Sequence, residues 1–287
     1  MPKKRSWISK AGELAERFSG RGKARKKMRG HLPELPKRVK IKPGARYLNL
    51  AKGEATPSQA VRPLTDAIAQ SYRAFLQHSP RKQVFVVGIG GAEGTAKTFL
   101  ASEITKLLGD HVEVRTLAMD DYYKMSRRER KKKVQELKRK GRMSRENLMI
   151  FEISNDPVLS DFQTLLEHIE ALKQGRPVQK HFYDHSNGEI IRNSRRVEPM
   201  QQGILLVEGI YALRKELRRA IDCGVFVFTG EEKKYQRVSK RDAAERAHGI
   251  YRSNKYFFEA QLTSYRRYIE PTIRNADIVV NTTHLFD

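Results

Sequence analysis

One segment, residues 84–104, constrains the fold more than any other part of the 287-residue sequence. An apolar run at 84–88 leads into a glycine-rich turn, and a helical pattern follows at 98–108. The turn reads GAEGTAKT and matches G-x-x-x-x-G-K-[ST], except that alanine replaces the second glycine. Backbone N–H groups at the start of a helix favour anions. The segment therefore predicts a phosphate-binding loop formed by Gly91, Gly94, Thr95, Ala96, Lys97 and Thr98.

In such a loop Lys97 contacts the β- and γ-phosphates of ATP, and the Thr98 hydroxyl helps to hold Mg²⁺, so we expect ATP and Mg²⁺ as cofactors. We expect Lys97 to face solvent. Ala96 adds a methyl group where the backbone passes closest to phosphate, and Glu93 adds a negative charge, so both departures would lower nucleotide affinity. Two alternatives stay open: a glycine-rich turn with an incidental Lys-Thr pair, and a dinucleotide-binding turn, although Glu93 stands where that motif needs its third glycine.

Apolar runs alternate with helical patterns from residue 83 onwards, which is typical of a parallel sheet covered by helices on both faces. The predicted fold class is therefore α/β with a five-stranded parallel sheet. The expected strands are 84–88, 112–119, 204–209, 225–228 and 277–280. The expected helices are 58–78, 98–108, 161–173, 213–221, 233–247 and 255–268.

Carboxylates follow two of the expected strands. Asp120 and Asp121 come after the second strand, and Glu208 ends the third. The carboxyl ends of parallel strands meet at the same crevice as the glycine-rich loop. One carboxylate there can take a proton from an acceptor hydroxyl, and another can hold Mg²⁺. The alternatives are helix capping for the two aspartates and a buried structural role for Glu208.

Further motifs in the same order give the sequence a specific resemblance. They are MDDYYK at 119–124, GRPVQKHFYDHSNGE at 175–189, LLVEGI at 205–210, KRDAAERAHG at 240–249 and YIEPTIRNADIVV at 268–280. With the glycine-rich loop, they resemble the uridine kinase/phosphoribulokinase family over about residues 84–281. This resemblance implies a P-loop fold like that of the nucleoside monophosphate kinases, with a mobile lid that carries arginines.

The resemblance also implies a function and roles for particular residues. The implied reaction is ATP- and Mg²⁺-dependent transfer of the γ-phosphate to a hydroxyl of a small molecule, with a nucleoside-like acceptor favoured. Asp120 matches the catalytic base and, with Glu208 and Thr98, a ligand of Mg²⁺. The residues that match the acceptor side are Tyr183, Asp184 and Asp156, and those that match the lid arginines are Arg241 and Arg246.

The departures from the family pattern fall mostly where the family reads its acceptor. The family's Phe-Asp-His-Pro-Asp element becomes Ser-Asn-Asp-Pro-Val at 154–158, and its His-Ser-Arg is replaced after His185. Two lid arginines appear as Val238 and His248. Each lost contact would leave a ligand group unpaired at a cost of about 1–3 kcal/mol, so we expect uridine to be a poor acceptor.

Charge is unevenly distributed along the chain, which has a formal net charge of +24. Residues 1–83 hold 21 Lys and Arg against 5 Asp and Glu. We therefore predict a basic, flexible arm at 1–57, a helical linker at 58–82 and the P-loop domain at 83–287. The arm, chiefly 1–45, favours a polyanionic partner such as nucleic acid. The alternatives are a solvated tail, an anionic membrane surface, and an organelle presequence that Glu13 and Glu16 disfavour.

Two functional hypotheses remain. The first is an active small-molecule kinase, and its variant is another acceptor of the same family, such as a sugar phosphate or pantothenate. The second is a weak or inactive protein of kinase fold that binds nucleotide and acts on RNA, DNA or a ribonucleoprotein through its basic arm. Cys223 is the single cysteine, so no internal disulfide can form, and no run of 18 apolar residues exists. A cytoplasmic location is the expectation for either hypothesis.

Overall fold

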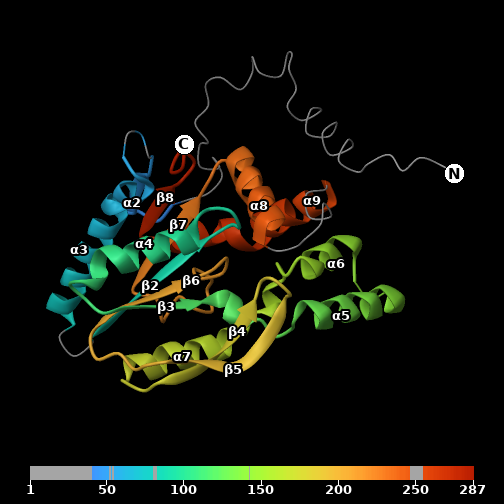
Figure 1. Cartoon of the computed structure of the whole chain (residues 1–287), viewed down its shortest axis with the longest axis horizontal. Coiled ribbons are helices and arrows are strands. Elements are labelled where there is room, and N and C mark those ends of the chain that lie inside the picture. The colour runs from blue at the N-terminus through green and yellow to red at the C-terminus, as the bar shows by residue number, and fades with distance from the viewer. Residues whose placement is uncertain (1–40, 52, 54, 80–82, 142, 246–254) are drawn as a thin grey trace, which may run out of the picture. The chain divides into compact units, whose positions relative to one another are not determined.

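A computed structural model describes residues 41–51, 53, 55–79, 83–141, 143–245 and 255–287 (Figure 1). These residues belong to one compact unit, Arg38–Asp287. Residues 1–40, which make up most of the expected basic arm, lie outside the described residues.

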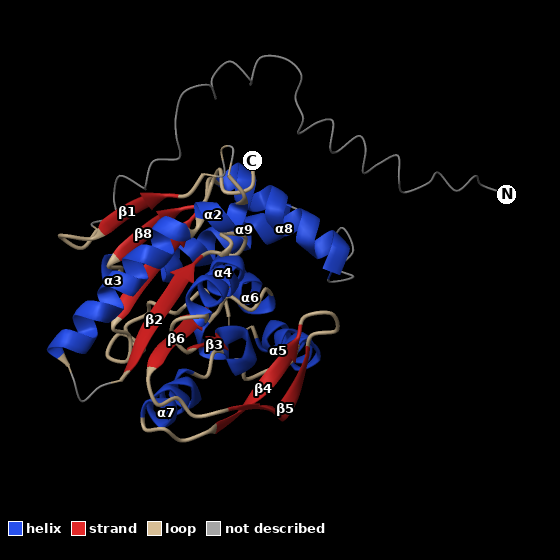
Figure 2. Cartoon of the chain, turned by 60° about the vertical axis from the view of Figure 1, so that its left-hand side comes forward, coloured by secondary structure: helices blue, strands red, loops and turns tan. Residues whose placement is uncertain are grey.

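The core of the unit is a six-stranded sheet in the order β1-β8-β7-β2-β6-β3, with every neighbouring pair parallel (Figures 1 and 2). Five of its strands confirm those expected from the sequence. They are β2 (Val84–Gly91), β3 (Val114–Ala118), β6 (Gly203–Glu208), β7 (Cys223–Phe228) and β8 (Ile278–Asn281). All residues of the central strand β2 are buried, as expected for a strand covered on both faces.

The sixth strand, β1 (Arg46–Asn49), was not expected. It pairs with β8 at the edge of the sheet, with Arg46 opposite Ile278. Three of its four side chains are exposed, so it carries neither the apolar run nor the clean alternation that marks a strand. The conformation of β1 is instead determined by backbone hydrogen bonding to β8, which is distant in sequence.

Two helices follow β1. Helix α2 (Pro57–Ala60) begins at Thr56, which forms a capping box with Gln59, and α3 (Arg62–His78) follows. The buried face of α3 packs against the same hydrophobic cluster as β2, β7 and β8 through Leu64, Ile68 and Tyr72. The compact unit therefore starts near Arg38, earlier than the boundaries expected at 57/58 and 82/83.

Helix α4 (Lys97–Gly109) packs on the same face of the sheet as α3 (Figure 2). The remaining α-helices are α5 (Arg127–Lys140), α6 (Arg145–Glu152), α7 (Phe162–Lys173), α8 (Glu231–Glu245) and α9 (Lys255–Ser264). Helix α9 continues into a π-helical turn at Tyr265–Ile269. None of the helices formed by these described residues is long and apolar enough to cross a membrane.

The helix expected at 213–221 is wrong, because this segment forms successive turns. Its amides bond three residues back, as from Leu217 to Arg214 and from Ala220 to Leu217, so no continuous helical ladder develops. The apolar pattern did predict burial correctly, because Leu213, Leu217 and Ile221 are all buried. Tertiary packing therefore uses the apolar pattern without a helix.

A second, two-stranded antiparallel sheet lies apart from the main sheet and was also missed (Figure 2). It consists of β4 (Val178–Asp184) and β5 (Glu189–Val197). Its turn is fixed to the start of α5, because the Arg127 amide donates to the Gly188 carbonyl at 2.8 Å. This contact brings the Tyr-Asp motif at the end of β4 beside the segment that follows β3.

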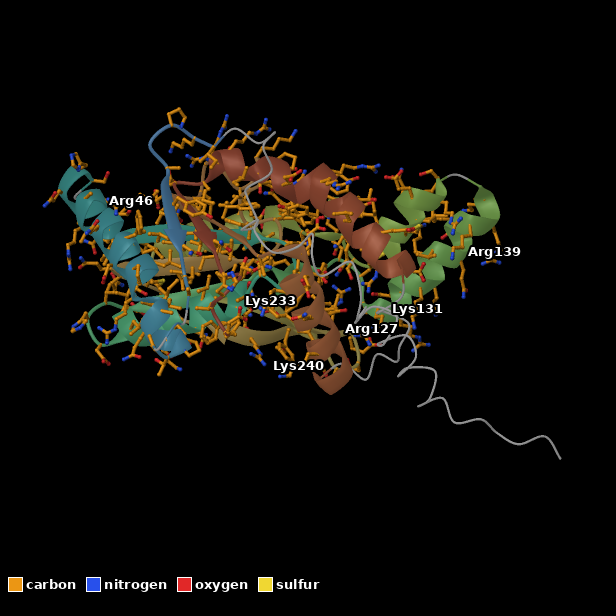
Figure 3. The ribbon with its side chains drawn as sticks, turned by 90° about the horizontal axis from the view of Figure 1, so that it is seen from above. Arg46, Arg127, Lys131, Arg139, Lys233 and Lys240 are labelled. Carbon is orange, nitrogen blue, oxygen red and sulfur yellow. The ribbon has the colours of Figure 1, made fainter. Side chains whose placement is uncertain are left out.

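Helix α5 is strongly basic, and Lys131 and Arg139 on it are exposed to solvent (Figure 3). It begins with a capping box in which the Ser126 hydroxyl accepts from the Glu129 amide, and the Glu129 carboxylate accepts from the Ser126 amide. Most of its charged side chains form a solvated face, whereas Arg130 and Val134 are buried.

Replacing Leu64 by alanine should show that α3 is part of the folded core. Leu64 is fully buried in the cluster beneath the sheet, so Leu64→Ala should lower the free energy of unfolding by about 2–5 kcal/mol. Gln77→Ala, at an exposed position of the same helix, should change it by less than about 0.5 kcal/mol. Denaturant unfolding measures both, and equal effects would mean that α3 is a linker.

Candidate active site

The turn after β2 is held by close backbone packing. Gly91 has φ of +143°, and a Cβ atom there would overlap the carbonyl oxygen of Val227 on β7. Gly94 has φ of +74°, and a Cβ atom there would lie 2.8 Å from Cγ2 of Val238 on α8. Both positions therefore require glycine. Val238, expected to mark a lost lid arginine, is buried against the loop, so this position serves packing.

Ala96 takes the left-handed conformation, with φ of +71°, immediately before α4. Such a conformation costs a residue with a Cβ atom roughly 1–2 kcal/mol. The methyl group packs against the hydrophobic cluster that includes Leu100 and Ile104. The substitution of glycine by alanine therefore imposes backbone strain, and the methyl group is directed at the core.

Lys97, the first residue of α4, is buried, contrary to the expectation that it faces solvent. Its Nζ donates a 2.7 Å hydrogen bond to the Ala92 carbonyl, so the ammonium folds across its own loop. The neighbouring Thr98 hydroxyl donates to Oε1 of Glu208 at 3.2 Å. These contacts join the start of α4 to the end of β6, as the carboxyl-end rule for parallel sheets predicts.

Glu208 is buried, and burial raises the pKa of its carboxyl group above the ordinary value. The negative charge of Asp120 raises that pKa further, whereas Lys97 and the Thr98 hydrogen bond lower it. The acid therefore lies within the electric field of both a cation and a second carboxylate. An arrangement of this kind is common where a cation binds.

Asp120 and Asp121 lie in the 3₁₀ turn Met119–Tyr122 and have different surroundings. The Asp120 side chain is 41% exposed, and its Oδ2 lies 3.3 Å from Nε2 of His185. Asp121 is buried, forms an ion pair with Lys180 and accepts the Tyr183 amide at 3.0 Å. Asp120 is thus available to a ligand, whereas Asp121 fixes β4 to the main sheet.

The Tyr-Asp motif lies next to Asp120. The buried Tyr183 ring packs edge-on against Tyr123 and His185, with ring centroids 5.2 and 5.1 Å apart. Asp184 accepts hydrogen bonds from the amide and hydroxyl of Ser186, and these bonds lower the pKa of its carboxyl group. Asp184 therefore closes the β4–β5 turn, while Tyr183 forms part of the wall beside Asp120.

The other sequence candidates have local roles or are only partly described. Asp156 caps a short 3₁₀ turn by accepting the Val158 amide at 3.0 Å. Arg241 lies within α8, whose backbone is described at that position. Arg246 and His248 fall outside the described residues.

Two contacts that the sequence did not suggest hold the loop against the helices of the lid region. Arg237 on α8 donates to the carbonyls of Thr282, at 2.7 Å, and Gly94, at 3.5 Å. The Glu93 carboxylate accepts a 2.6 Å hydrogen bond from Gln261 on α9. Glu93, expected to weaken nucleotide binding, is thus engaged with α9, and no local sequence pattern indicates either long-range contact.

The oxygen atoms of Thr98, Glu208 and Asp120 are hard donors of the kind that Mg²⁺ takes in proteins. No group of three or more His, Cys, Asp and Glu side chains among the described residues forms a complete metal site. A Mg²⁺ ion usually keeps several waters and binds through one or two carboxylates plus substrate phosphates. The donor set therefore fits a Mg²⁺ that arrives with a nucleotide.

Ala96→Gly should relieve the strain before α4. The variant removes a left-handed alanine but adds unfolded-state entropy, so stability should be unchanged or rise by up to about 1 kcal/mol. The matched control is Ala101→Gly at a buried position inside α4, which should lose about 1 kcal/mol or more. Denaturant unfolding compares the two, and a similar loss in both would contradict the strain.

Comparisons with known proteins agree with this geometry. The phosphoribulokinase of Synechocystis sp. is 28% identical to this chain over 199 residues. The match covers 69% of this chain but only 53% of the relative, so the chain spans about half of that protein's length. The uridine kinase of Staphylococcus haemolyticus is 29% identical over 197 residues, covering 68% of this chain and 86% of the relative.

Among solved structures, D-glycerate 3-kinase from Cryptococcus neoformans matches 77% of this chain and 95% of its own with a TM-score of 0.58. Its sequence identity is 15%, so this likeness concerns the fold alone. The model of the phosphoribulokinase / uridine kinase family matches residues 86–285. With its parallel sheet, its phosphate loop and this match, the chain belongs to the phosphoribulokinase / uridine kinase family.

Proposed function

We propose that the protein is a phosphotransferase that moves the γ-phosphate of ATP, with Mg²⁺, to a hydroxyl of a small molecule. The observation that carries this proposal is the pairing of Thr98 with Glu208 beside Lys97 at the carboxyl edge of the sheet. Asp120 lies across the same edge and influences Glu208 electrostatically. A purely structural turn would not need these four groups together.

Each group has a distinct role in the proposed reaction. Lys97 would neutralise phosphate charge, and Thr98 and Glu208 would hold Mg²⁺, whose positive charge would offset the negative charge of the phosphates. Asp120 accepts the proton of the acceptor hydroxyl, whose oxygen then bonds to the γ-phosphorus as the bond to the ADP oxygen breaks. His185 orients the Asp120 carboxylate through their 3.3 Å contact. Arg241 and Arg246 in the lid would stabilise the transferring phosphoryl group.

The family resemblance favours a nucleoside-like acceptor beside Tyr183, Asp184 and Asp156. Two features of this chain argue against uridine itself. Asp184 is engaged by Ser186 in the hairpin turn, and Asn155 stands where the family has an acidic residue. A uridine acceptor would therefore lose contacts worth about 1–3 kcal/mol each.

The two neighbouring aspartates should respond differently to the same change. Asp120→Asn should reduce kcat by about 10²–10⁴ with little effect on stability or ATP affinity, because it removes an exposed general base. Asp121→Asn weakens a buried ion pair with Lys180 and should mainly lower stability, by about 3–5 kcal/mol if that pair is fully lost. Phosphoryl-transfer rates and thermal unfolding separate the effects, and the opposite ranking would refute the assignment of the base.

The proposed function is tested by measuring ATP-dependent phosphorylation of a panel of small-molecule hydroxyl acceptors by the purified protein. Lys97→Ala is the control for nucleotide binding. Thermal-shift titration with Mg·ATP should show stabilisation of the wild-type protein and a much smaller shift in Lys97→Ala. An unchanged shift in the variant would place nucleotide binding elsewhere.

A second candidate function is nucleic-acid binding through the basic arm. It is favoured by the net charge of +16 within residues 1–83, which hold 21 Lys and Arg against 5 Asp and Glu. If about six phosphates are neutralised, log K should fall with log salt with a slope near −5 on duplex and near −4 on single strands. The test compares RNA and DNA binding by the full chain and by a shortened protein beginning at Arg38, which keeps β1 and α3. Equal affinities would exclude residues 1–37 as the nucleic-acid site, and a flat salt response would exclude binding through phosphates.

A further inference from the structure

Charge is segregated around helix α5, which holds nine Lys and Arg against two Glu. Both glutamates lie on one strip of the helix, where Glu129 caps the helix start and Glu136 pairs with Lys133 and Lys140. The neighbouring exposed strip holds only cations and one glutamine, at helical spacing: Arg128, Lys131, Lys132, Gln135 and Arg139 (Figure 3). None of its four cations forms an ion pair with a carboxylate of the described residues. We call these four cations the α5 cationic face.

The β4–β5 hairpin extends the α5 cationic face. The Arg127 amide donates to the Gly188 carbonyl at 2.8 Å, and the Arg127 guanidinium donates to the His185 carbonyl at 3.0 Å. A Cβ atom on Gly188 would lie only 2.5 Å from Cβ of Arg127, so the hairpin turn and the helix start are in direct contact. Helix α5 and β5 therefore lie side by side (Figures 1 and 2). Strand β5 adds two exposed cations, Arg192 and Arg195.

The charges of the α5 cationic face oppose the folding of the helix. Arg128 lies three and four residues before Lys131 and Lys132, and like charges at this spacing destabilise a helix. Arg128 also lies in the first turn, where the helix dipole favours anions over cations. The capping box at the start of α5 offsets part of this cost. Folding alone therefore does not explain the face, whereas a polyanionic partner would remove the repulsion.

The geometry of the face suits the phosphate backbone of a nucleic acid. Arg128 and Arg139 are separated by about 16 Å along the helix axis, at about 1.5 Å per residue. Residues three or four apart on a helix lie about 5–6 Å from one another, so the face is a rigid row of closely spaced cations. A nucleic-acid duplex presents a row of closely spaced phosphates, with one negative charge per about 1.7 Å of its axis.

Apolar and aromatic groups, which a membrane or unstacked bases would need, are missing from the exposed strip. The apolar Val134 of α5 points inwards and packs with Phe151 and Leu159, whereas a helix that lies in a membrane surface directs its apolar side outwards. The Phe182 ring of the hairpin is covered by the Arg195 guanidinium, 3.7 Å from the ring centroid. The face therefore offers charge without a stacking platform for bases.

We propose that the α5 cationic face, extended by Arg192 and Arg195, binds the phosphate backbone of a nucleic-acid duplex without reading its sequence. These cations belong to the folded domain, so this surface is distinct from the basic arm. The proposal does not depend on the phosphotransferase reaction. Phosphate contacts of this kind release counterions, which makes the affinity steeply dependent on salt. Because bases find no stacking partner on the face, single strands should bind it more weakly than duplexes.

The test is a double variant of the full chain, Arg128→Gln with Lys132→Gln. We would measure the affinity for short duplexes of DNA and of RNA, each in two unrelated sequences, by fluorescence anisotropy across a salt series. The slope of log K against log salt should become less steep by about 2, since each lost phosphate contact reduces it by about 1. Affinity at about 0.1 M salt should fall by about 10- to 100-fold, equally for both sequences.

The matched control removes two exposed cations from another helix, with Arg62→Gln and Arg73→Gln on α3. Helix α3 lies at the left and α5 at the right of Figures 1 and 2. The control has the same net charge as the test variant but should keep the wild-type slope. Glutamine forms helices about as well as lysine and arginine. The midpoint of thermal unfolding of the test variant should therefore be unchanged or higher, because the variant relieves repulsion.

The proposal is overturned if the full chain does not bind duplexes at low salt, or if the test variant keeps the wild-type slope. An equal loss in the α3 control would also overturn it, because the effect would then belong to net charge alone. Vesicles containing phosphatidylserine test the membrane as an alternative partner. Vesicle binding that is lost in the test variant while duplex binding persists would contradict a nucleic-acid surface.

Discussion

The position of the phosphate loop depends on the close contact between Gly91 and the carbonyl of Val227 on the neighbouring strand β7. No side chain fits between them, so the turn after β2 follows the end of the sheet closely. The Thr282 hydroxyl then donates to the Thr95 carbonyl at 3.1 Å, and Arg237 reaches the Gly94 carbonyl from α8. The loop is thus fixed from several elements that lie far apart in sequence, and the amides at the start of α4 take their direction from it.

The departures from the glycine-rich pattern are compensated by this packing. The methyl group of Ala96 packs into the core, Val238 fills the space above Gly94, and Glu93 bonds to Gln261 of α9. Each change keeps the loop in place while altering what surrounds it. The strain at Ala96 is small compared with the folding free energy of a domain, about 5–15 kcal/mol. Comparison of the loop with the motif residue by residue therefore underestimates how well the loop conformation is kept.

The five main strands and the convergence of Lys97, Thr98 and Glu208 were predictable, because both follow from apolar runs and from the geometry of parallel strand ends. Strand β1 was not, because its exposed residues gain their conformation from pairing with β8. The buried position of Lys97 was also missed, since it arises from a backbone carbonyl that no pattern reveals. The resemblance pointed to Tyr183, which packs against Tyr123 and His185, whereas no local pattern pointed to Arg237, which donates to the loop from α8.

Buried polar groups in two parts of the molecule differ in how fully their hydrogen bonds are satisfied. On the nucleotide side, the polar groups described above find partners within the protein, as Thr98 does with Glu208 and Lys97 with Ala92. Near the carboxyl end of α6, by contrast, Nη1 of Arg130 and Oδ1 of Asn155 are buried without a hydrogen-bond partner among the described residues. Satisfied groups rigidify a site, whereas unsatisfied buried groups gain most from a ligand of complementary charge. The loop is therefore the rigid part of the candidate site, whereas an unpartnered buried polar atom elsewhere costs about 1–3 kcal/mol.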